Sequence, residues 1–219
     1  MKIVVDDKIP YLKGHVETIS DEVVYMNGGD IDAAIVADAD VLIVRTRTRC
    51  DKSLLEGSKV KLVVTATIGY DHIDVDYLRE VGIKWTNCPG CNASSVRQYV
   101  HNSLLVLGLL KQGLTVGVVG VGHVGTLVAT DLTDAGMNVL LCDPPLSELR
   151  KRGGEEWESA PLAQSPLRDM EMVSLQRIAL EADIITFHTP LVMSGNAPTY
   201  HLADKDFFTL LAKKPLIIN

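Results

Sequence analysis

Three glycines and one aspartate carry the clearest chemical pattern in this sequence of 219 residues. Gly120, Gly122 and Gly125 follow an apolar, β-branched run with G-x-G-x-x-G spacing, and Asp143 closes the next apolar run. Glycines so spaced permit a tight turn, the approach of a pyrophosphate to the backbone and close packing of the next helix. The N-terminus of that helix offers unpaired N–H groups and a partial positive charge to phosphate. The order strand, glycines, helix, strand and acid predicts a dinucleotide-binding βαβ unit.

Asp143 also predicts which dinucleotide binds. Its carboxylate can accept hydrogen bonds from both ribose hydroxyls of the adenosine half and repels a 2′-phosphate, which favours NAD over NADP. The basic run Arg150–Arg152 could serve a 2′-phosphate, but such a run is more often a solvated loop. Two alternatives are a ligand-free glycine turn and a methyltransferase, whose loop usually follows an acidic residue. Val118 and Val119 stand at that position instead.

The composition narrows the class of protein. Hydrophobic residues make up 47% of the chain, enough for one large domain or two small ones, and the net charge of −7 argues against a general nucleic-acid binder. The start lacks the apolar region of a signal peptide, and runs such as Leu104–Leu110 are too short to span a bilayer. Four scattered cysteines without a secretory signal favour a reduced, cytoplasmic setting. We therefore expect no nucleic-acid partner and no membrane contact.

Alternating apolar runs predict two Rossmann-like α/β units with parallel sheets, residues 1–91 and 92–219, the second incomplete. In the first unit, strands are expected at Lys2–Val5, Val23–Met26, Ala39–Val44, Leu62–Thr65 and Ile83–Thr86, and helices at Ile9–Ile19, Ile31–Ala37, Ser53–Glu56 and Asp74–Val81. In the second unit, strands are expected at Thr115–Val119, Met137–Cys142, Asp183–His188 and Leu216–Asn219, in the sheet order third, second, first, fourth.

The helices of the second unit begin with Ala93–Leu110, which links the two units. Thr126–Ala135 is the next helix and ends at Gly136, and two more helices are expected at Met172–Glu181 and within Leu202–Leu211. Leu146–Asp169 is polar and contains a Gly-Gly pair and two prolines. We expect this segment to be an exposed, mobile loop.

Six motifs resemble those of the D-isomer-specific 2-hydroxyacid dehydrogenases. They are TATIGYDHID (Thr65–Asp74), PGCNASSV (Pro89–Val96), VGVVGVGHVG (Val116–Gly125), LLCDPP (Leu140–Pro145), DIITFHTPL (Asp183–Leu191) and YHLAD (Tyr200–Asp204). The resemblance implies a flavodoxin-like substrate unit at 1–91, a Rossmann NAD-binding unit at 92–219, and hydride transfer from a 2-hydroxy acid to NAD. It also implies a homodimer.

The resemblance assigns residues to two sites. Thr46, Thr67 and the backbone near Gly69 face the substrate, and Thr189 lines the nicotinamide side of a cofactor site. The remaining cofactor residues are Gly120, Gly122, His123, Val124, Gly125 and Asp143. The catalytic arginine, glutamate and histidine and the dimerisation region are expected after Asn219. The chain should then bind NAD weakly and turn over no substrate. A different dehydrogenase of the family and a non-catalytic NAD-binding regulator are the alternatives.

Arg45, Arg47 and Arg49 would share one face of a regular strand, an arrangement that suits a phosphate. For Arg47 and Arg49 we prefer a charged solvent face. Arg45 is the best candidate to bind the phosphate of a small phosphorylated hydroxy acid, provided that the strand ends near Val44.

Two histidines and a cysteine pair could also carry chemistry. We interpret His188 as a structural, hydrogen-bonded histidine, and His72 as part of a network with Asp71 that locks a loop. Cys88 and Cys91 form a C-x-x-C, which could indicate zinc or redox chemistry. Because no second C-x-x-C exists and the intervening Pro-Gly fits the turn of the family, we interpret the pair as structural and predict no metal.

Overall fold

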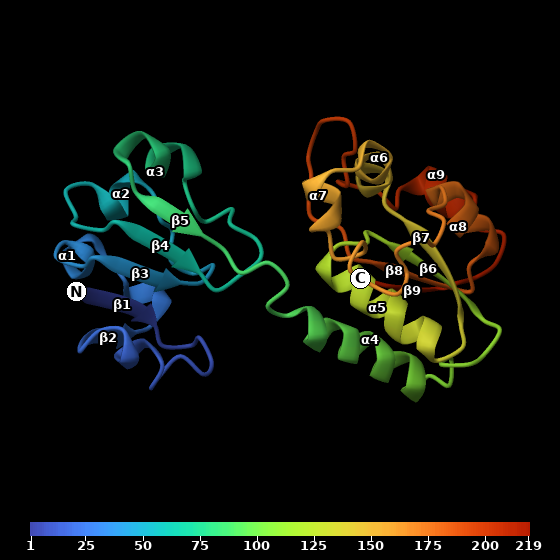
Figure 1. The fold of residues 1–219 in the computed structure, drawn as a ribbon, viewed down its shortest axis with the longest axis horizontal. Coiled ribbons are helices and arrows are strands. Elements are labelled where there is room, and N and C mark those ends of the chain that lie inside the picture. The colour runs from blue at the N-terminus through green and yellow to red at the C-terminus, as the bar shows by residue number, and fades with distance from the viewer. The chain divides into compact units, whose positions relative to one another are not determined.

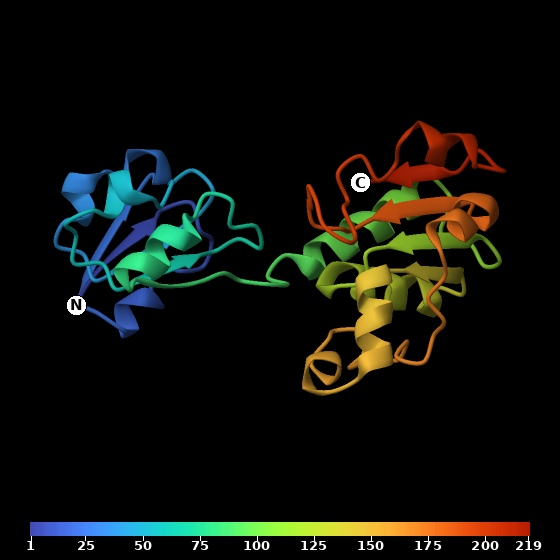
Figure 2. The same cartoon turned by 90° about the horizontal axis from the view of Figure 1, so that it is seen from above.

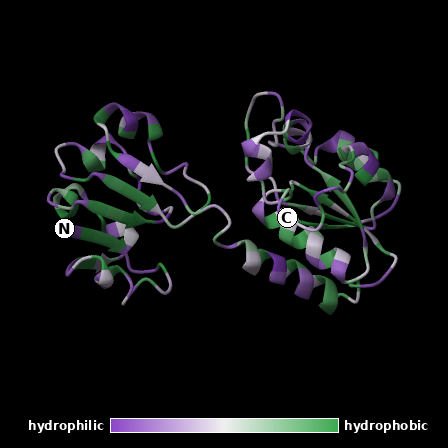
Figure 3. Cartoon of the chain, in the orientation of Figure 1, coloured by the Kyte–Doolittle hydropathy of each residue, from purple (hydrophilic) through white to green (hydrophobic).

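The computed structural model describes residues 1–219, which divide into two compact units, Met1–Cys91 and Asn92–Asn219. Each unit contains one parallel β-sheet with helices packed against it (Figure 1). Apart from the edge strand Lys84–Thr86, the strands of both sheets are apolar along most of their length, as expected for parallel strands buried on both faces (Figure 3). No helix of the structure combines the length and hydropathy needed to span a bilayer.

The first unit has a five-stranded sheet in the order β2-β1-β3-β4-β5, with every pair parallel. Its strands are β1 (Lys2–Asp6), β2 (Glu22–Met26), β3 (Val41–Val44), β4 (Leu62–Thr65) and β5 (Lys84–Thr86). Its helices are η1 (Val16–Thr18), η2 (Gly28–Asp30), α1 (Ala33–Val36), α2 (Lys52–Leu55) and α3 (Val75–Val81). The three α-helices pack on one face of this sheet around Leu42, Val63 and Leu78. The predicted alternation of strands and helices is confirmed from β2 onward.

The predicted helix Ile9–Ile19 is wrong. The segment consists of turns with one 3-10 turn, η1, whose only buried residue is Val16. Pro10 has no N–H to donate, and Tyr11 and Gly14 have φ angles of 62° and 91°, which no right-handed helix contains.

The second unit has a four-stranded parallel sheet. Its strands are β6 (Thr115–Val119), β7 (Asn138–Cys142), β8 (Ile184–Phe187) and β9 (Leu216–Ile218). Helices α4 (Ala93–Val106) and α5 (His123–Asp134) pack on one face, where Leu104 and Leu132 are buried. Helices α8 (Leu175–Glu181) and α9 (Lys205–Thr209) contribute Ile178 and Phe207 to a second core.

The predicted strand order of this sheet is wrong. The order is β7-β6-β8-β9, that is second, first, third, fourth, because β8 pairs with the free side of β6. The outer side of β7 carries only a single bridge between Leu141 and Met172, where the Val173 N–H donates to the Leu141 carbonyl at 2.7 Å. The prediction placed β8 at this outer side of β7, where the structure has only the bridge to Met172.

The prediction of a mobile loop at Leu146–Asp169 is also wrong. Helices α6 (Pro144–Arg152) and α7 (Glu155–Glu158) occupy its first part, and they lie beyond the β7 edge of the sheet (Figure 2). Trp157 and Leu162 are 5% and 0% exposed within the core that α4 and α5 also line. A few large apolar residues are enough to pack a polar segment against the core. The prediction failed because it relied on the average polarity of the segment.

Helix ends in the second unit differ from expectation in three places. Helix α8 begins at Leu175, three residues later than predicted. Helix α5 begins at His123, three residues earlier than predicted, so that Gly125 lies inside it. Helix α4 ends at Val106 because Gly108 adopts a φ of 66°. The ends predicted at Gly82 and Gly136 are confirmed, since both glycines have left-handed φ angles of 76° and 79°.

Candidate functional site

The glycine loop joins β6 to α5 and has little room for side chains at two of its three glycines. A Cβ on Gly120, whose φ is +86°, would lie 2.8 Å from the His188 carbonyl carbon, and a Cβ on Gly125 would lie 1.9 Å from the Gly120 oxygen. A Cβ on Gly122 would meet nothing within 4 Å. The first and third glycines therefore permit packing within the protein, and the second leaves space above the loop.

Helix α5 begins beside this space with an open N-terminus. Its N-cap is Gly122, which has no side chain to accept a hydrogen bond from the first turn. The backbone N–H groups of His123, Val124 and Gly125 belong to that first turn and have no partner within the helix. This arrangement can bind an anionic group such as a phosphate.

Asp143 connects the glycine loop to α6. Its Oδ2 accepts a hydrogen bond from the Val121 N–H at 2.9 Å, and its Oδ1 accepts one from the Leu146 N–H, also at 2.9 Å. The carboxylate is thus the N-cap of α6, which continues with Pro144 in its first turn. Each oxygen retains a further lone pair, so the same carboxylate can accept a ligand hydroxyl. The cap was not predicted, although the Asp-Pro-Pro triplet is a helix-start signal.

A cavity of about 420 Å³ opens at the carboxyl ends of β6, β7 and β8. Gly120, Gly122, Asp143 and Thr189 line it, which brings four of the predicted cofactor residues together. Most of the other lining residues are apolar or prolines, among them Leu175, Pro190, Val192, Ala197, Pro198 and Leu202. Ligands of open α/β sheets bind at this edge.

One wall of the cavity is formed by a segment that sequence reasoning missed, 190–199. The Thr199 hydroxyl donates to the Pro190 carbonyl and accepts from the Val192 N–H, the latter at 2.8 Å. These bonds close the segment into a loop beside Asp143 and Thr189. No local sequence pattern predicts that this segment lines the cavity, because it is distant in the sequence from the glycine loop and comes close to it only in the folded chain.

His188 lines the same cavity but is held by the protein. Its Nε2 lies 2.9 Å from the Thr186 hydroxyl, and burial lowers the pKa of His188 to about 4. The imidazole is therefore neutral near pH 7 and hydrogen-bonded, as expected for a structural histidine.

In the first unit, Arg45 and Thr46 directly follow the end of β3 at Val44, so the condition set for both residues is met. The Arg45 guanidinium donates from Nε and Nη2 to the two Asp6 carboxylate oxygens at 3.0 and 3.2 Å. Asp6 is fully buried, and the Arg45 side chain is 31% exposed. Because the strand ends, the three arginines do not share a strand face, and Arg49 pairs with Asp51 at 2.9 Å.

The loop after β4 is held by a chain of hydroxyl hydrogen bonds. The Thr67 hydroxyl donates to the Gly69 carbonyl at 2.8 Å and lies 2.7 Å from the Thr65 hydroxyl, which is 2.8 Å from His72 Nε2. Since Thr67 has used its one proton, Thr65 must donate to Thr67 and His72 must donate to Thr65. Burial lowers the pKa of His72, in keeping with a neutral imidazole. The predicted hydrogen-bond network that holds this loop therefore exists, but it joins His72 to threonines rather than to Asp71.

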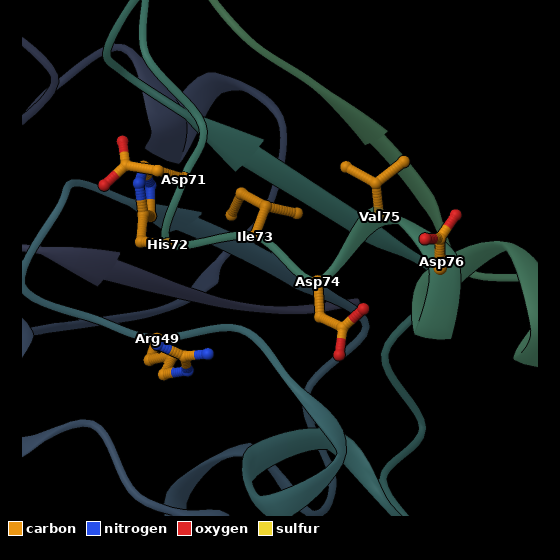
Figure 4. Close-up of a pocket in the computed structure, with 7 residues that line it drawn as sticks. All are labelled: Arg49, Asp71, His72, Ile73, Asp74, Val75 and Asp76. Carbon is orange, nitrogen blue, oxygen red and sulfur yellow. The ribbon is translucent and has the colours of Figure 1, made fainter. Parts of the chain in front are cut away.

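A second cavity, of about 340 Å³, lies next to this loop (Figure 4). Asp71 and His72 lie at one end of it and Asp76 at the other, at the start of α3. Asp74 accepts from the Tyr77 N–H at 3.0 Å as the N-cap of α3, and Asp76 pairs with Arg79 at 2.8 Å. No three His, Cys, Asp or Glu side chains of the structure are grouped to hold a metal.

Comparisons with known proteins agree with this architecture. The model of the D-isomer specific 2-hydroxyacid dehydrogenase catalytic domain matches residues 3–212. A protein of Bacteroides thetaiotaomicron named erythronate-4-phosphate dehydrogenase is 49% identical over 100% of this chain, which spans 59% of that protein's length.

Solved structures show the same fold. The match to the structure of D-2-hydroxyisocaproate dehydrogenase covers 100% of this chain and 70% of the dehydrogenase chain, with a TM-score of 0.73 at 19% identity. The NAD⁺-bound 3-phosphoglycerate dehydrogenase of Entamoeba histolytica matches 88% of this chain and 63% of its own, with a TM-score of 0.62 at 26% identity. With the family model matching nearly its whole length, the chain belongs to the D-isomer-specific 2-hydroxyacid dehydrogenases.

Proposed function

We propose that this chain is part of an NAD-dependent dehydrogenase that oxidises 4-phospho-D-erythronate to 3-hydroxy-2-oxo-4-phosphobutanoate. The observation that carries the proposal is the 49% identity, over the whole chain, to a protein named erythronate-4-phosphate dehydrogenase. The product would feed the synthesis of pyridoxal 5′-phosphate. We further propose that the complete protein works in the cytoplasm as a homodimer.

The cavity of the second unit suits a dinucleotide. NAD⁺, when bound, supplies the acceptor for the hydride that leaves the substrate carbon. The first-turn N–H groups of α5 and the open space at Gly122 would receive its pyrophosphate. The free lone pairs of Asp143 would accept the adenosine ribose hydroxyls, and Thr189 would line the nicotinamide side. The NAD⁺-bound state of the Entamoeba histolytica structure supports this assignment.

The carboxyl edge of the first sheet suits the substrate. Val44 and Thr65 are paired across β3 and β4, which brings Thr46 and Thr67 to the same edge. We propose that Arg45 binds the substrate phosphate, with its guanidinium oriented by buried Asp6. The hydroxyl of Thr46 and the backbone near Gly69 would bind the other end of the hydroxy acid. His72 is buried, His188 is half-buried, and the ring Nε2 of each is hydrogen-bonded to a threonine hydroxyl, so neither is assigned as the proton acceptor.

The test is an assay of the complete gene product, because the chain spans 59% of the length of the Bacteroides thetaiotaomicron protein. Formation of NADH is followed with 4-phosphoerythronate, with D-lactate and with D-3-phosphoglycerate at equal concentrations. The proposal predicts turnover with 4-phosphoerythronate far above that with the other two acids. A preference for another acid would indicate a different dehydrogenase of the family. Binding of NAD without turnover of any acid would indicate the non-catalytic regulator.

A further inference from the structure

The Cys88-Pro89-Gly90-Cys91 segment forms a tight turn with a cysteine at each end. The Cys91 N–H donates to the Cys88 carbonyl at 3.2 Å, and Gly90 has a φ of 79°. Proline in the second position and a positive φ in the third are the features of a type II turn. Such a turn keeps its first and fourth Cα atoms within about 7 Å, and disulfides span Cα separations of about 4.4–6.8 Å.

The other two cysteines provide a contrast. Cys50 and Cys142 are 0% and 2% exposed, and burial raises the pKa of their thiols to about 12 and about 11. Cys91 is exposed and Cys88 is half-buried. Thiol chemistry needs access and a thiolate, so only the turn cysteines can react in the folded chain.

The turn is also bonded to the loop that follows β4. The Cys88 N–H donates to the Thr67 carbonyl at 3.1 Å, and the Asn87 side-chain amide donates to the Ile68 carbonyl at 2.7 Å. Two hydrogen bonds therefore connect the turn to the backbone of Thr67 and Ile68. On the C-terminal side, Cys91 is the last residue of the first unit.

The turn and the exposure of its cysteines revise the structural interpretation that the sequence alone favoured. We propose that Cys88 and Cys91 are a site of reversible oxidation, at which a low-molecular-weight disulfide such as glutathione disulfide converts two thiols into a disulfide within the turn. The Cys91 thiolate attacks one sulfur of the oxidant, the oxidant's S–S bond breaks, and one glutathione thiolate leaves. The Cys88 thiolate then attacks the Cys91 sulfur and releases the second glutathione. The protein loses two electrons and two protons, and the oxidant becomes two thiols.

The consequence for the substrate rests on the proposed function, in which Thr67 and the backbone near Gly69 face the hydroxy acid. A disulfide across the turn would restrain Cys88 and, through its bond to Thr67, the loop beside it. The thiol chemistry itself needs neither substrate nor NAD. It is therefore tested in the absence of both, and its failure is distinguishable from failure of the proposed function.

The first experiment treats the reduced 219-residue chain with glutathione disulfide near neutral pH, followed by intact mass measurement and peptide mapping. We expect the loss of two hydrogen atoms, mapped to a bridge between Cys88 and Cys91, with Cys50 and Cys142 unreacted. Cys88→Ser should stop at one glutathione on Cys91, with no bridge. Inertness of both turn thiols, or a stable glutathione adduct on the unmodified sequence, would overturn the proposal.

The second experiment compares amide hydrogen exchange of the oxidised and reduced chain. Oxidation should slow exchange at Cys88 and Cys91 several-fold, while the amides of β1 keep their rates. Because Cys91→Ser cannot form the bridge, the same treatment should leave its Cys88 exchange unchanged. Equal exchange at Cys88 in the oxidised and reduced chain would show that the bridge does not act on the loop after β4.

Discussion

At the scale of residues, Arg45 and Asp6 show what spacing along a sequence can and cannot predict. Arg45 was identified from its position after a strand, but its carboxylate partner lies 39 positions away and no local pattern connects the two. The glycine loop was predictable because its three glycines follow one apolar run at a fixed spacing, although the side chain that Gly120 excludes would meet His188, far along the chain. Asp143 was identified as a ligand group, and its bond to Val121 emerged only with the fold.

The ion pair of Arg45 leads to a prediction about stability. Arg45→Ala leaves the Asp6 carboxylate, which is fully buried, without its partner, and should lower the free energy of unfolding of the first unit by about 3 kcal/mol. In a Trp157→Phe background, Trp85 is the one remaining tryptophan and reports this unit alone during urea unfolding. Arg47→Ala, at an exposed position, is the matched control and should change stability by less than about 0.5 kcal/mol. Equal effects of the two substitutions would contradict the ion pair.

His188 predicts a pH dependence of the second unit. Its pKa is about 4 when folded, against about 6.5 for an ordinary histidine, so the unfolded chain binds the extra proton first as the pH falls. The neutral His188 therefore contributes up to about 3 kcal/mol to the free energy of unfolding of the second unit. This contribution is fully present above about pH 6.5 and is lost as the pH falls from there to about pH 4. His188→Gln should remove this part of the acid sensitivity, as measured by Trp157 fluorescence during urea unfolding in a Trp85→Phe background. Superimposable pH profiles of the two proteins would refute the prediction.

At the scale of elements, strands were more predictable than their order or the segments between them. β-branched apolar runs such as Thr115–Val119 mark a buried strand locally, and the structure has that strand at the same residues. The order in a sheet depends on which side of β6 receives β8, and no residue of either strand encodes that choice by itself. The helix predicted at Ile9–Ile19 failed because Pro10, Tyr11 and Gly14 outweigh its apolar spacing.

The segment 146–169 gives a prediction at the same scale. If it is packed as the structure shows, Trp157→Ala should lower the free energy of unfolding of the second unit by about 3–5 kcal/mol, because a 5%-exposed indole leaves a cavity. Circular dichroism during urea unfolding measures the loss. Glu156→Ala changes an exposed neighbour in α7 and should have little effect. A similarly small effect of Trp157→Ala would restore the mobile-loop interpretation.

At the scale of the whole molecule, the two units carry different parts of the proposed reaction. The cavity at Gly122 and Asp143 lies entirely in the second unit, and the edge with Thr46 and Thr67 lies in the first. The resemblance of six motifs was sufficient to predict both the family and two parallel-sheet units. It could not predict the loop at 190–199, whose place in the cavity wall depends on the folded sheet.

The most direct test of the proposed cofactor site is a titration of the isotope-labelled chain with NAD, followed by the backbone amide signals. The proposal predicts shifts at Gly120, Gly122, His123, Val124, Gly125, Asp143 and Thr189, and none in the strands of the first unit. Asp143→Ala should weaken binding by about 10- to 150-fold, the equivalent of a charge-assisted hydrogen bond of about 1.5–3 kcal/mol, and should narrow the preference over NADP. Asp134→Ala, which removes an exposed carboxylate at the end of α5, should leave the affinity unchanged. Shifts confined to other residues, or an affinity unaltered by Asp143→Ala, would contradict the dinucleotide site.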